Sequence, residues 1–306
     1  YLYDRYGDDI SSLKLVFPSR RARLFFSDAL AAVAQRPLWQ PSFVTVDELM
    51  EQVAGVGRSD HIKLLTELYK VYSRHHDEPF DAFYFWGDML LADFDQIDKY
   101  LIDADMLFAN IGDLHRLEDH FSYLTPEQVE LIERFWKNFR QQTPFSQEQQ
   151  QFIKIWESLG KIYHEFRDGL AAQGLAYEGM VHRLAAEKLR LPEAVALDTA
   201  SRYVVIGFNA LSACEKRLFV WLQNTGQAEF FWDYDRYYVE NPDHEAGLFL
   251  RSNLLDYPAP EGVVGADHFR SPKEIVAVSS PSDSLQCKYV HTFLQGLLDR
   301  GLYPDK

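Results

Sequence analysis

Short apolar runs alternate with amphipathic stretches over the first part of the chain. The run from Leu13 to Phe17 is typical of a buried strand and stops at Pro18. Ser19 is the expected N-cap of the helix that follows. The apolar positions after it recur at helical spacing: Ala22, Phe25, Phe26, Ala29, Leu30 and Val33. The pattern therefore predicts a strand that leads directly into a helix.

A second strand is predicted at Phe43 and Val44, and Thr45-Val-Asp-Glu48 follows it as a capping box. The helix that this box opens is expected to end near Gly55. From about Asp60 to Thr199 helical periodicity dominates and no strand pattern appears. The helices predicted in this stretch are Ile62 to His75, Phe80 to Tyr100, Pro126 to Phe139, Gln147 to Ala172 and Tyr177 to Leu189.

Strand character returns at Tyr203 to Ile206, and Ser212-Ala-Cys-Glu215 is a second capping box, opening a helix to about Leu222. The last elements predicted are strands at Glu229 to Trp232 and Ile275 to Ser279 and a helix from Leu285 to Leu298. Because strands alternate with helices at both ends, we expect an α/β fold with a parallel sheet. Residues 1–59 and 200–260 would form the sheet domain, 60–199 a large all-helical insertion, and 261–306 the start of a second α/β domain.

The charge balance changes which partners are plausible. With 31 basic and 46 acidic residues the net charge is −15, which argues against indiscriminate binding to nucleic acid or an anionic membrane. Twelve acidic residues lie between Asp77 and Asp119, so an acidic protein-docking face is one alternative. The chain has two cysteines without metal-type spacing, no apolar run long enough for a membrane span and no signal peptide. These features favour a cytoplasmic protein. Because the chain opens at Tyr1 rather than at Met, we expect it to be a fragment.

Sequence motifs for catalysis are missing. The Gly160-Lys161 pair lies inside a helical pattern and lacks the remaining residues of a phosphate-binding loop. No lysine has an acidic residue two positions before it, as a PD-(D/E)XK nuclease requires. We therefore expect no catalytic residue in this chain, and neither ATP nor Mg²⁺ bound to it.

Two groups of side chains could coordinate a metal, although we assign no metal ligand. Asp88, Asp93, Asp95 and Asp98 cluster along one predicted helix, and His115, Glu118, Asp119 and His120 lie within six residues. The simpler interpretation of the aspartates is a solvated acidic face beside an apolar stripe.

Basic residues gather where the first strand meets its helix. Arg20, Arg21 and Arg23, with Lys14, give a local charge of +4, with no acidic residue between Ile10 and Ser27. The donors of a helix N-terminus also favour phosphate. Ser19, Arg20, Arg21 and Arg23 are thus the candidate nucleic-acid-binding residues, against the alternative that they face only solvent.

The segment Leu15-Val-Phe-Pro-Ser-Arg-Arg-Ala-Arg23 resembles the strand and turn that meet single-stranded DNA in superfamily I helicases. The segment from Tyr203 to Lys216 resembles the helicase strand and loop that normally carry the Asp-Glu pair of the Walker B motif. Here Ile206 and Gly207 occupy those two positions. Neither side chain can hold a cation or orient water, so the resemblance implies a degenerate site.

Together with Trp86-Gly-Asp-Met-Leu-Leu-Ala-Asp-Phe-Asp95 and Tyr177-Glu-Gly-Met-Val181, these segments resemble the AddB-like subunits of bacterial exonuclease/helicase complexes. The resemblance covers nearly the whole chain. It implies a RecA-like (P-loop NTPase-type) fold, a role in double-strand-break repair and recombination, and a downstream metal-dependent PD-(D/E)XK nuclease domain. The implied partners are DNA, as single strands or duplex ends, and an AddA-like helicase-nuclease subunit.

The first hypothesis is therefore an ATPase-inactive, helicase-like DNA-binding scaffold. A second hypothesis is part of an active helicase or nuclease whose catalytic motifs lie outside these residues. The third is an acidic protein-interaction module that does not bind DNA.

Overall fold

The computed structural model describes residues 1–109, 147–191, 195, 197–198, 200–273 and 275–302. It divides into two compact units, Tyr1–Ala266 and Asp267–Lys306. None of the helices among the described residues combines the length and the apolar character that a membrane span needs.

The larger unit contains a four-stranded sheet built from β1 (Leu13–Phe17), β2 (Ser42–Thr45), β3 (Arg202–Ile206) and β4 (Ala228–Phe231). The strand order is β2-β1-β3-β4, and every neighbouring pair is parallel. The prediction that the strands at Leu15, Val204 and Phe230 share one parallel sheet is confirmed. The chain is therefore an α/β protein.

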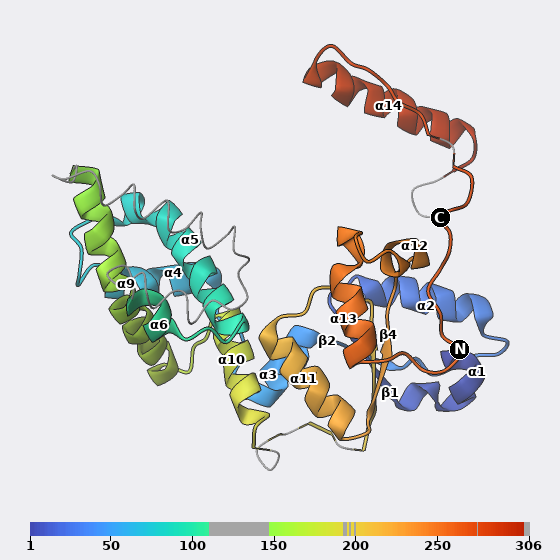
Figure 1. The fold of residues 1–306 in the computed structure, drawn as a ribbon, viewed down its shortest axis with the longest axis horizontal. Coiled ribbons are helices and arrows are strands. Elements are labelled where there is room, and N and C mark those ends of the chain that lie inside the picture. Colours follow the sequence, from blue (N-terminus) through green and yellow to red (C-terminus); the bar gives the residue numbers. More distant parts are fainter. Residues whose placement is uncertain (110–146, 192–194, 196, 199, 274, 303–306) are drawn as a thin grey trace. The chain divides into compact units, whose positions relative to one another are not determined.

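Both faces of the sheet are buried, as is usual for parallel strands. Leu15 and Val204 point to a face covered by α1 (Leu2–Tyr6), the 3-10 helix η1 (Gly7–Ser12) and α2 (Ala22–Val33). Val16 and Val205 point to the opposite face, where α3 (Val46–Ala54) and α11 (Ala213–Asn224) contribute buried side chains. Figure 1 shows the sheet between these two sets of helices.

The order of the strands explains why α2 and α11 lie on opposite faces. The chain moves from β1 to β2 in one direction along the sheet and from β3 to β4 in the other. Because parallel crossovers are right-handed, the connecting helices of the two moves must cover different faces. The direction changes between β1 and β3, and in open α/β sheets the ligand crevice lies at the carboxyl ends of the strands beside such a point.

Helix α2 differs from its prediction in two ways. Its N-cap is Arg21 and not Ser19, and no side chain caps it, so the prediction of a Ser19 cap is wrong. Phe26 and Leu30 pack against the sheet, whereas Phe25 is 67% exposed. The physical reason for the later start is that β1 is followed by a turn through Pro18 to Arg21, which delays the helix by two residues.

Both capping boxes are confirmed. Thr45 and Glu48 exchange side-chain and backbone hydrogen bonds at the start of α3, which ends at Gly55 with a φ of 73°. Ser212 and Glu215 do the same for α11.

The described part of 60–199 consists of helices and contains no strand. These helices are α4 (His61–Tyr72), α5 (Phe80–Lys99), α6 (Ala104–Ala109), α9 (Gln147–Ala172) and α10 (Glu178–Lys188). Leu65, Phe94 and Phe166 belong to the same hydrophobic cluster as Val205 of the sheet. This stretch therefore shares a core with the sheet, and a separate insertion subdomain stays a prediction. The helix predicted at Pro126 to Phe139 and the group from His115 to His120 lie outside the described residues.

The remaining elements of the larger unit follow β4. They are α12 (Arg236–Glu240), the 3-10 helix η4 (Glu245–Gly247) and α13 (Leu248–Asp256). The indole N–H of Trp232 donates to the carbonyl oxygen of Tyr257 at 2.8 Å, which fixes the end of α13 beside β4.

The smaller unit contains α14 (Asp283–Asp299), which confirms the helix predicted from Leu285 to Leu298, and its N-cap is Ser282. The strand predicted at Ile275 to Ser279 is wrong, because the described residues 275–279 are exposed and belong to no strand. An apolar run needs a neighbouring strand to pair with, and the described part of this unit offers none.

Candidate functional site

The loop between β1 and α2 lies at the carboxyl edge of the sheet and carries the predicted basic residues. Ser19, Arg20, Arg21 and Arg23 are all exposed. Arg21 is the N-cap of α2 and Arg23 its second residue. Within the described residues, neither of these two arginines has an ion-pair partner, so their charge is available to a ligand.

Arg20 is held by an acidic residue that is distant in sequence. Its Nη2 lies 2.6 Å from Oε1 of Glu48, on the first turn of α3. The other carboxylate oxygen of Glu48 accepts from the backbone N–H of Thr45 at 2.9 Å. The Thr45 hydrogen bond, helped by Arg20, lowers the pKa of Glu48. One carboxylate thus caps α3 and also positions Arg20.

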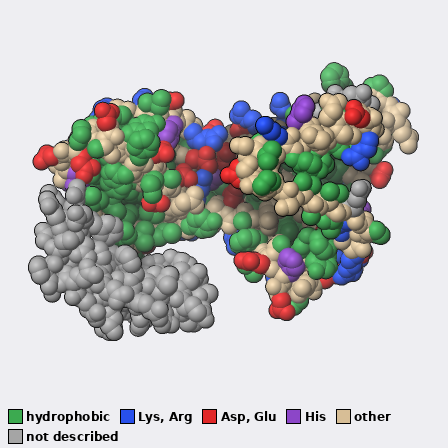
Figure 2. Space-filling model, turned by 90° about the horizontal axis from the view of Figure 1, so that it is seen from above, with side chains coloured by type: hydrophobic (Ala, Val, Ile, Leu, Met, Phe, Trp, Pro, Cys, Tyr) green, Lys and Arg blue, Asp and Glu red, His purple; other side chains and the backbone are tan. Residues whose placement is uncertain are grey.

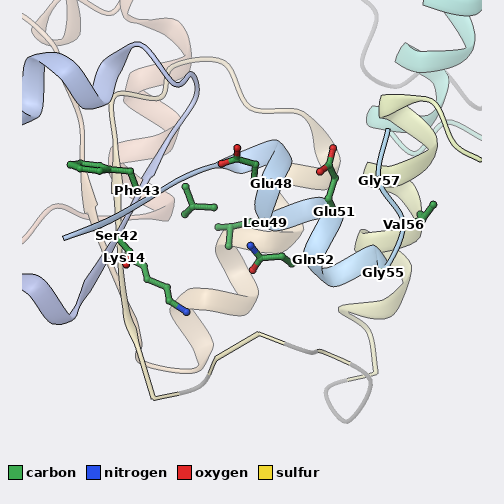
Figure 3. Close-up of a pocket in the computed structure, with 11 residues that line it drawn as sticks. Lys14, Ser42, Phe43, Glu48, Leu49, Glu51, Gln52, Gly55, Val56 and Gly57 are labelled. Atoms are coloured by element: carbon green, nitrogen blue, oxygen red, sulfur yellow. The ribbon is translucent and has the colours of Figure 1, made fainter. Parts of the chain in front are cut away.

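Two hollows meet at Glu48. A small cavity of about 70 Å³ is lined by Ser19, Arg20 and Arg23 together with the ends of β1 and β2. A larger one of about 530 Å³ lies between the sheet and α3. In Figure 3, Lys14 extends from β1 toward Leu49 and Gln52 of α3.

The local charge of +4 counted along the sequence overstates the positive charge that is free to bind a ligand. Lys14 pairs with Asp198 at 3.1 Å and its ammonium lies 5.6 Å from the centre of the Tyr203 ring. Arg20 pairs with Glu48. Counting neighbours along the sequence missed both acids, because the fold brings them in from other elements. Two cations, Arg21 and Arg23, remain unpaired within the described part of this loop.

The predicted Walker B position lies at the carboxyl end of β3, the strand next to β1. Ile206 packs on the α2 face of the sheet. Gly207 has a φ of 78°, and its N–H donates to the carbonyl oxygen of Phe231 at 3.2 Å. This backbone conformation is unfavourable for any residue with a side chain. The backbone at this predicted position is therefore adapted to glycine.

Asp88 and Asp93 of α5 are exposed, as the predicted acidic face requires, whereas Asp95 and Asp98 are not, so that prediction is wrong for these two. Asp98 is fully buried and accepts hydrogen bonds from the hydroxyls of Tyr163, at 2.5 Å, and Tyr177. Arg183 Nε lies 2.5 Å and Arg167 Nε 3.6 Å from its carboxylate, as ion pairs without hydrogen-bond geometry. Two cations and two hydroxyls thus compensate one buried charge, which gives Asp98 a structural role.

Asp95 is also part of this contact between α5 and α10. It lies 2.8 Å from Lys99, and its carboxylate accepts from the N–H of Gly179 at 2.5 Å. A Cβ atom at Gly179 would lie 2.2 Å from the carbonyl oxygen of Asp95, so only glycine allows this approach. The two segments Trp86–Asp95 and Tyr177–Val181, quoted above for the family resemblance, therefore pack directly on each other.

One group of metal-type ligands converges within the described residues: Asp47, Glu178 and His182. The guanidinium of Arg58 already bridges it, with Nη1 at 3.3 Å from Asp47 and 2.7 Å from Glu178. His182, which is buried, lies 3.2 Å from Asp47, and its hydrogen bond lowers the pKa of that carboxylate. Such alternation of charges is visible in Figure 2, where acidic and basic side chains lie next to each other near the middle of the face. The group is an ion-pair network that carries its own cation.

No protein-family model matches the sequence, and no curated protein is significantly similar to it. The candidate site therefore stands on its geometry and on the motifs above. Sequence reasoning identified the segment from Ser19 to Arg23, here called the arginine loop, but missed Glu48 as the partner of Arg20. The Thr45-Val-Asp-Glu48 capping box had already placed Glu48 beside the end of β2.

Proposed function

We propose that this chain is an ATPase-inactive, helicase-like scaffold that binds single-stranded DNA along the carboxyl edge of its sheet. The observation that carries the proposal is the position of the arginine loop. It follows β1, next to the change of strand direction, where α/β proteins hold their ligands. Arg21 and Arg23 offer unpaired charge there, within the described residues, at the start of a helix.

The absence of ATP chemistry is supported by the end of β3. Helicase catalysis needs a carboxylate pair for Mg²⁺ and water, whereas Ile206 is apolar and Gly207 has left-handed backbone. The sheet can then serve as a rigid support for the loop without turning over nucleotide.

The resemblance to AddB-like subunits supplies the finer part of the proposal. It implies a RecA-like version of this parallel sheet, a helical insertion in 60–199 and a second α/β domain beginning near residue 261. The partners would be DNA ends and an AddA-like helicase-nuclease subunit in double-strand-break repair, with metal-dependent cleavage carried out by a nuclease domain outside these residues.

Fluorescence anisotropy with a labelled single-stranded oligonucleotide tests the proposal. Binding is expected at low salt, without phosphate release, and ATP added at constant ionic strength and constant Mg²⁺ concentration should leave the affinity unchanged. A chain that binds no oligonucleotide at low salt, or that hydrolyses ATP with Mg²⁺, would contradict it.

A protein-interaction role is the second candidate, and a surface of α5 favours it. Phe85 is 78% and Met89 68% exposed, and they lie one helical turn apart on the same face. Exposed apolar side chains that adjoin one another can form part of a protein-contact surface. This role becomes the better one if the oligonucleotide does not bind.

A further inference from the structure

A second basic hollow lies between α10 and α11. Its volume is about 360 Å³, within the range of small-ligand sites. Three cations line it: Arg190 beyond the end of α10, and Lys216 and Arg217 on α11. The remaining wall contains the apolar side chains of Leu189, Val220 and Trp221 and the polar side chain of Asn224. The hollow therefore combines positive charge with an aromatic surface.

These cations are not accounted for by internal ion pairs. Within the described residues, no carboxylate lines the hollow and none lies within ion-pair distance of Arg190, Lys216 or Arg217. Glu187 acts on Arg217 from a greater distance. Three positive charges that converge without an ion-pair partner among the described residues repel one another, and a bound anion would relieve that repulsion.

Helix electrostatics explains one of the three. Arg190 lies near the C-terminal end of α10, where the helix dipole favours a cation. Lys216 and Arg217 lie in the first half of α11, where the dipole gives a cation no stabilisation. Burial, and next the charge of Arg190, lower the pKa of Arg217.

We propose that this hollow binds a nucleotide unit, with the phosphate between Arg190 and Arg217 and the base against Trp221. Guanidinium groups match phosphate oxygens in geometry, and aromatic rings stack on any base. The nucleotide could be free or part of a single strand, since the same chemistry serves both. The site is separate from the arginine loop and does not rest on the function proposed above.

Binding of thymidine monophosphate, inorganic phosphate and a short labelled oligo(dT) to the whole chain tests this site. The double variant R190Q/R217Q is expected to weaken binding of the mononucleotide by about tenfold per arginine. The control K63Q/K161Q removes the same charge from exposed positions on α4 and α9 and should leave it unchanged. Lys216→Gln, at an exposed position in the same hollow, provides a second variant should the double variant fail to fold.

The three ligands distinguish a site for free nucleotides from a site for nucleotides within a single strand. Mononucleotide binding that depends on the arginines identifies a site for free nucleotides, and dependence seen with oligo(dT) alone identifies a site along a strand. Equal binding of mononucleotide and inorganic phosphate would overturn the nucleotide assignment. Unchanged binding of every ligand by R190Q/R217Q, or an equal loss in the control, would overturn the site itself. The mononucleotide result does not involve the arginine loop, so failure here and failure of the proposed scaffold function are separable.

Discussion

The guanidinium of Arg20 lies 2.6 Å from the carboxylate of Glu48, which also caps α3 through Thr45. Replacing Glu48 by Gln removes the ion pair but keeps the cap, because Gln serves equally in a capping box. Glu48→Gln should therefore free Arg20, raise the affinity for single-stranded DNA at low salt and steepen its salt dependence by roughly 0.7 in logarithmic slope. Anisotropy titrations at several salt concentrations measure both effects.

Thr45→Ala is the matched control for that variant. It removes the hydroxyl that accepts from Glu48 N at 3.2 Å while leaving all charges in place. It should cost about 1 kcal/mol of stability and leave the salt slope unchanged. If Glu48→Gln leaves both affinity and slope at their wild-type values, Arg20 does not contact DNA.

Asp98 should be among the most sensitive positions in the chain. Asp98→Asn leaves the charges of Arg167 and Arg183 without their buried partner, and breaking one side of such a pair costs about 3 kcal/mol or more. Urea denaturation measures the loss. Asp93→Asn on the exposed side of the same helix should change stability by less than about 0.5 kcal/mol. Equal effects of the two variants would show that the buried network contributes nothing specific.

The sequence could predict the sheet because its signals are local. The run Leu13–Phe17 and the two capping boxes each lie within a few residues, and the structure confirms them. The sequence could not predict the surroundings of Asp98, since its partners Tyr163, Tyr177 and Arg183 come from helices far along the chain. Helical periodicity puts Asp98 within the apolar stripe, four residues after Phe94 and three before Leu101, but only tertiary packing supplies the partners of its charge.

The same limit applies to the candidate site. Charge counted along the sequence located Arg20, Arg21 and Arg23 correctly at the end of β1. It could not show that Glu48 would neutralise one of them, nor that Arg190 and Arg217 would meet across two helices. Contacts between distant elements depend on the order of the strands, which no single motif encodes.

Gly207 offers a test of the backbone conformation at the end of β3. Its φ of 78° makes Gly207→Ala destabilising by about 1 kcal/mol, although a Cβ atom there would meet no described atom within 4 Å. Gly169→Ala, in open space within α9, should instead stabilise the protein by about 0.5–1 kcal/mol. Thermal unfolding of the two variants compares the signs, and a stabilising Gly207→Ala would remove the argument that this backbone is adapted to glycine.

Asp47 should make the unfolding free energy depend on pH in the acidic range. The hydrogen bond from His182 lowers its pKa below the usual 3.8, so the ionised carboxylate stabilises the folded state above that value. This contribution is lost as the pH falls through the folded pKa. The difference in unfolding free energy between wild type and Asp47→Asn should thus be constant above about pH 5 and shrink below about pH 4. A difference that stays constant throughout acid titration would show that the carboxylate is unperturbed.

The salt dependence of single-stranded DNA binding tests the central claim most directly. Each arginine that neutralises a phosphate contributes roughly 0.7 to the slope of log affinity against log salt, so R21Q/R23Q should flatten the slope by roughly 1.4. The control K63Q/K161Q removes the same charge from α4 and α9 and should leave the slope unchanged. A flattened slope in R21Q/R23Q alone is the result that the scaffold function predicts. Identical slopes in wild type and R21Q/R23Q would contradict it, because the arginine loop would then carry no phosphate contact.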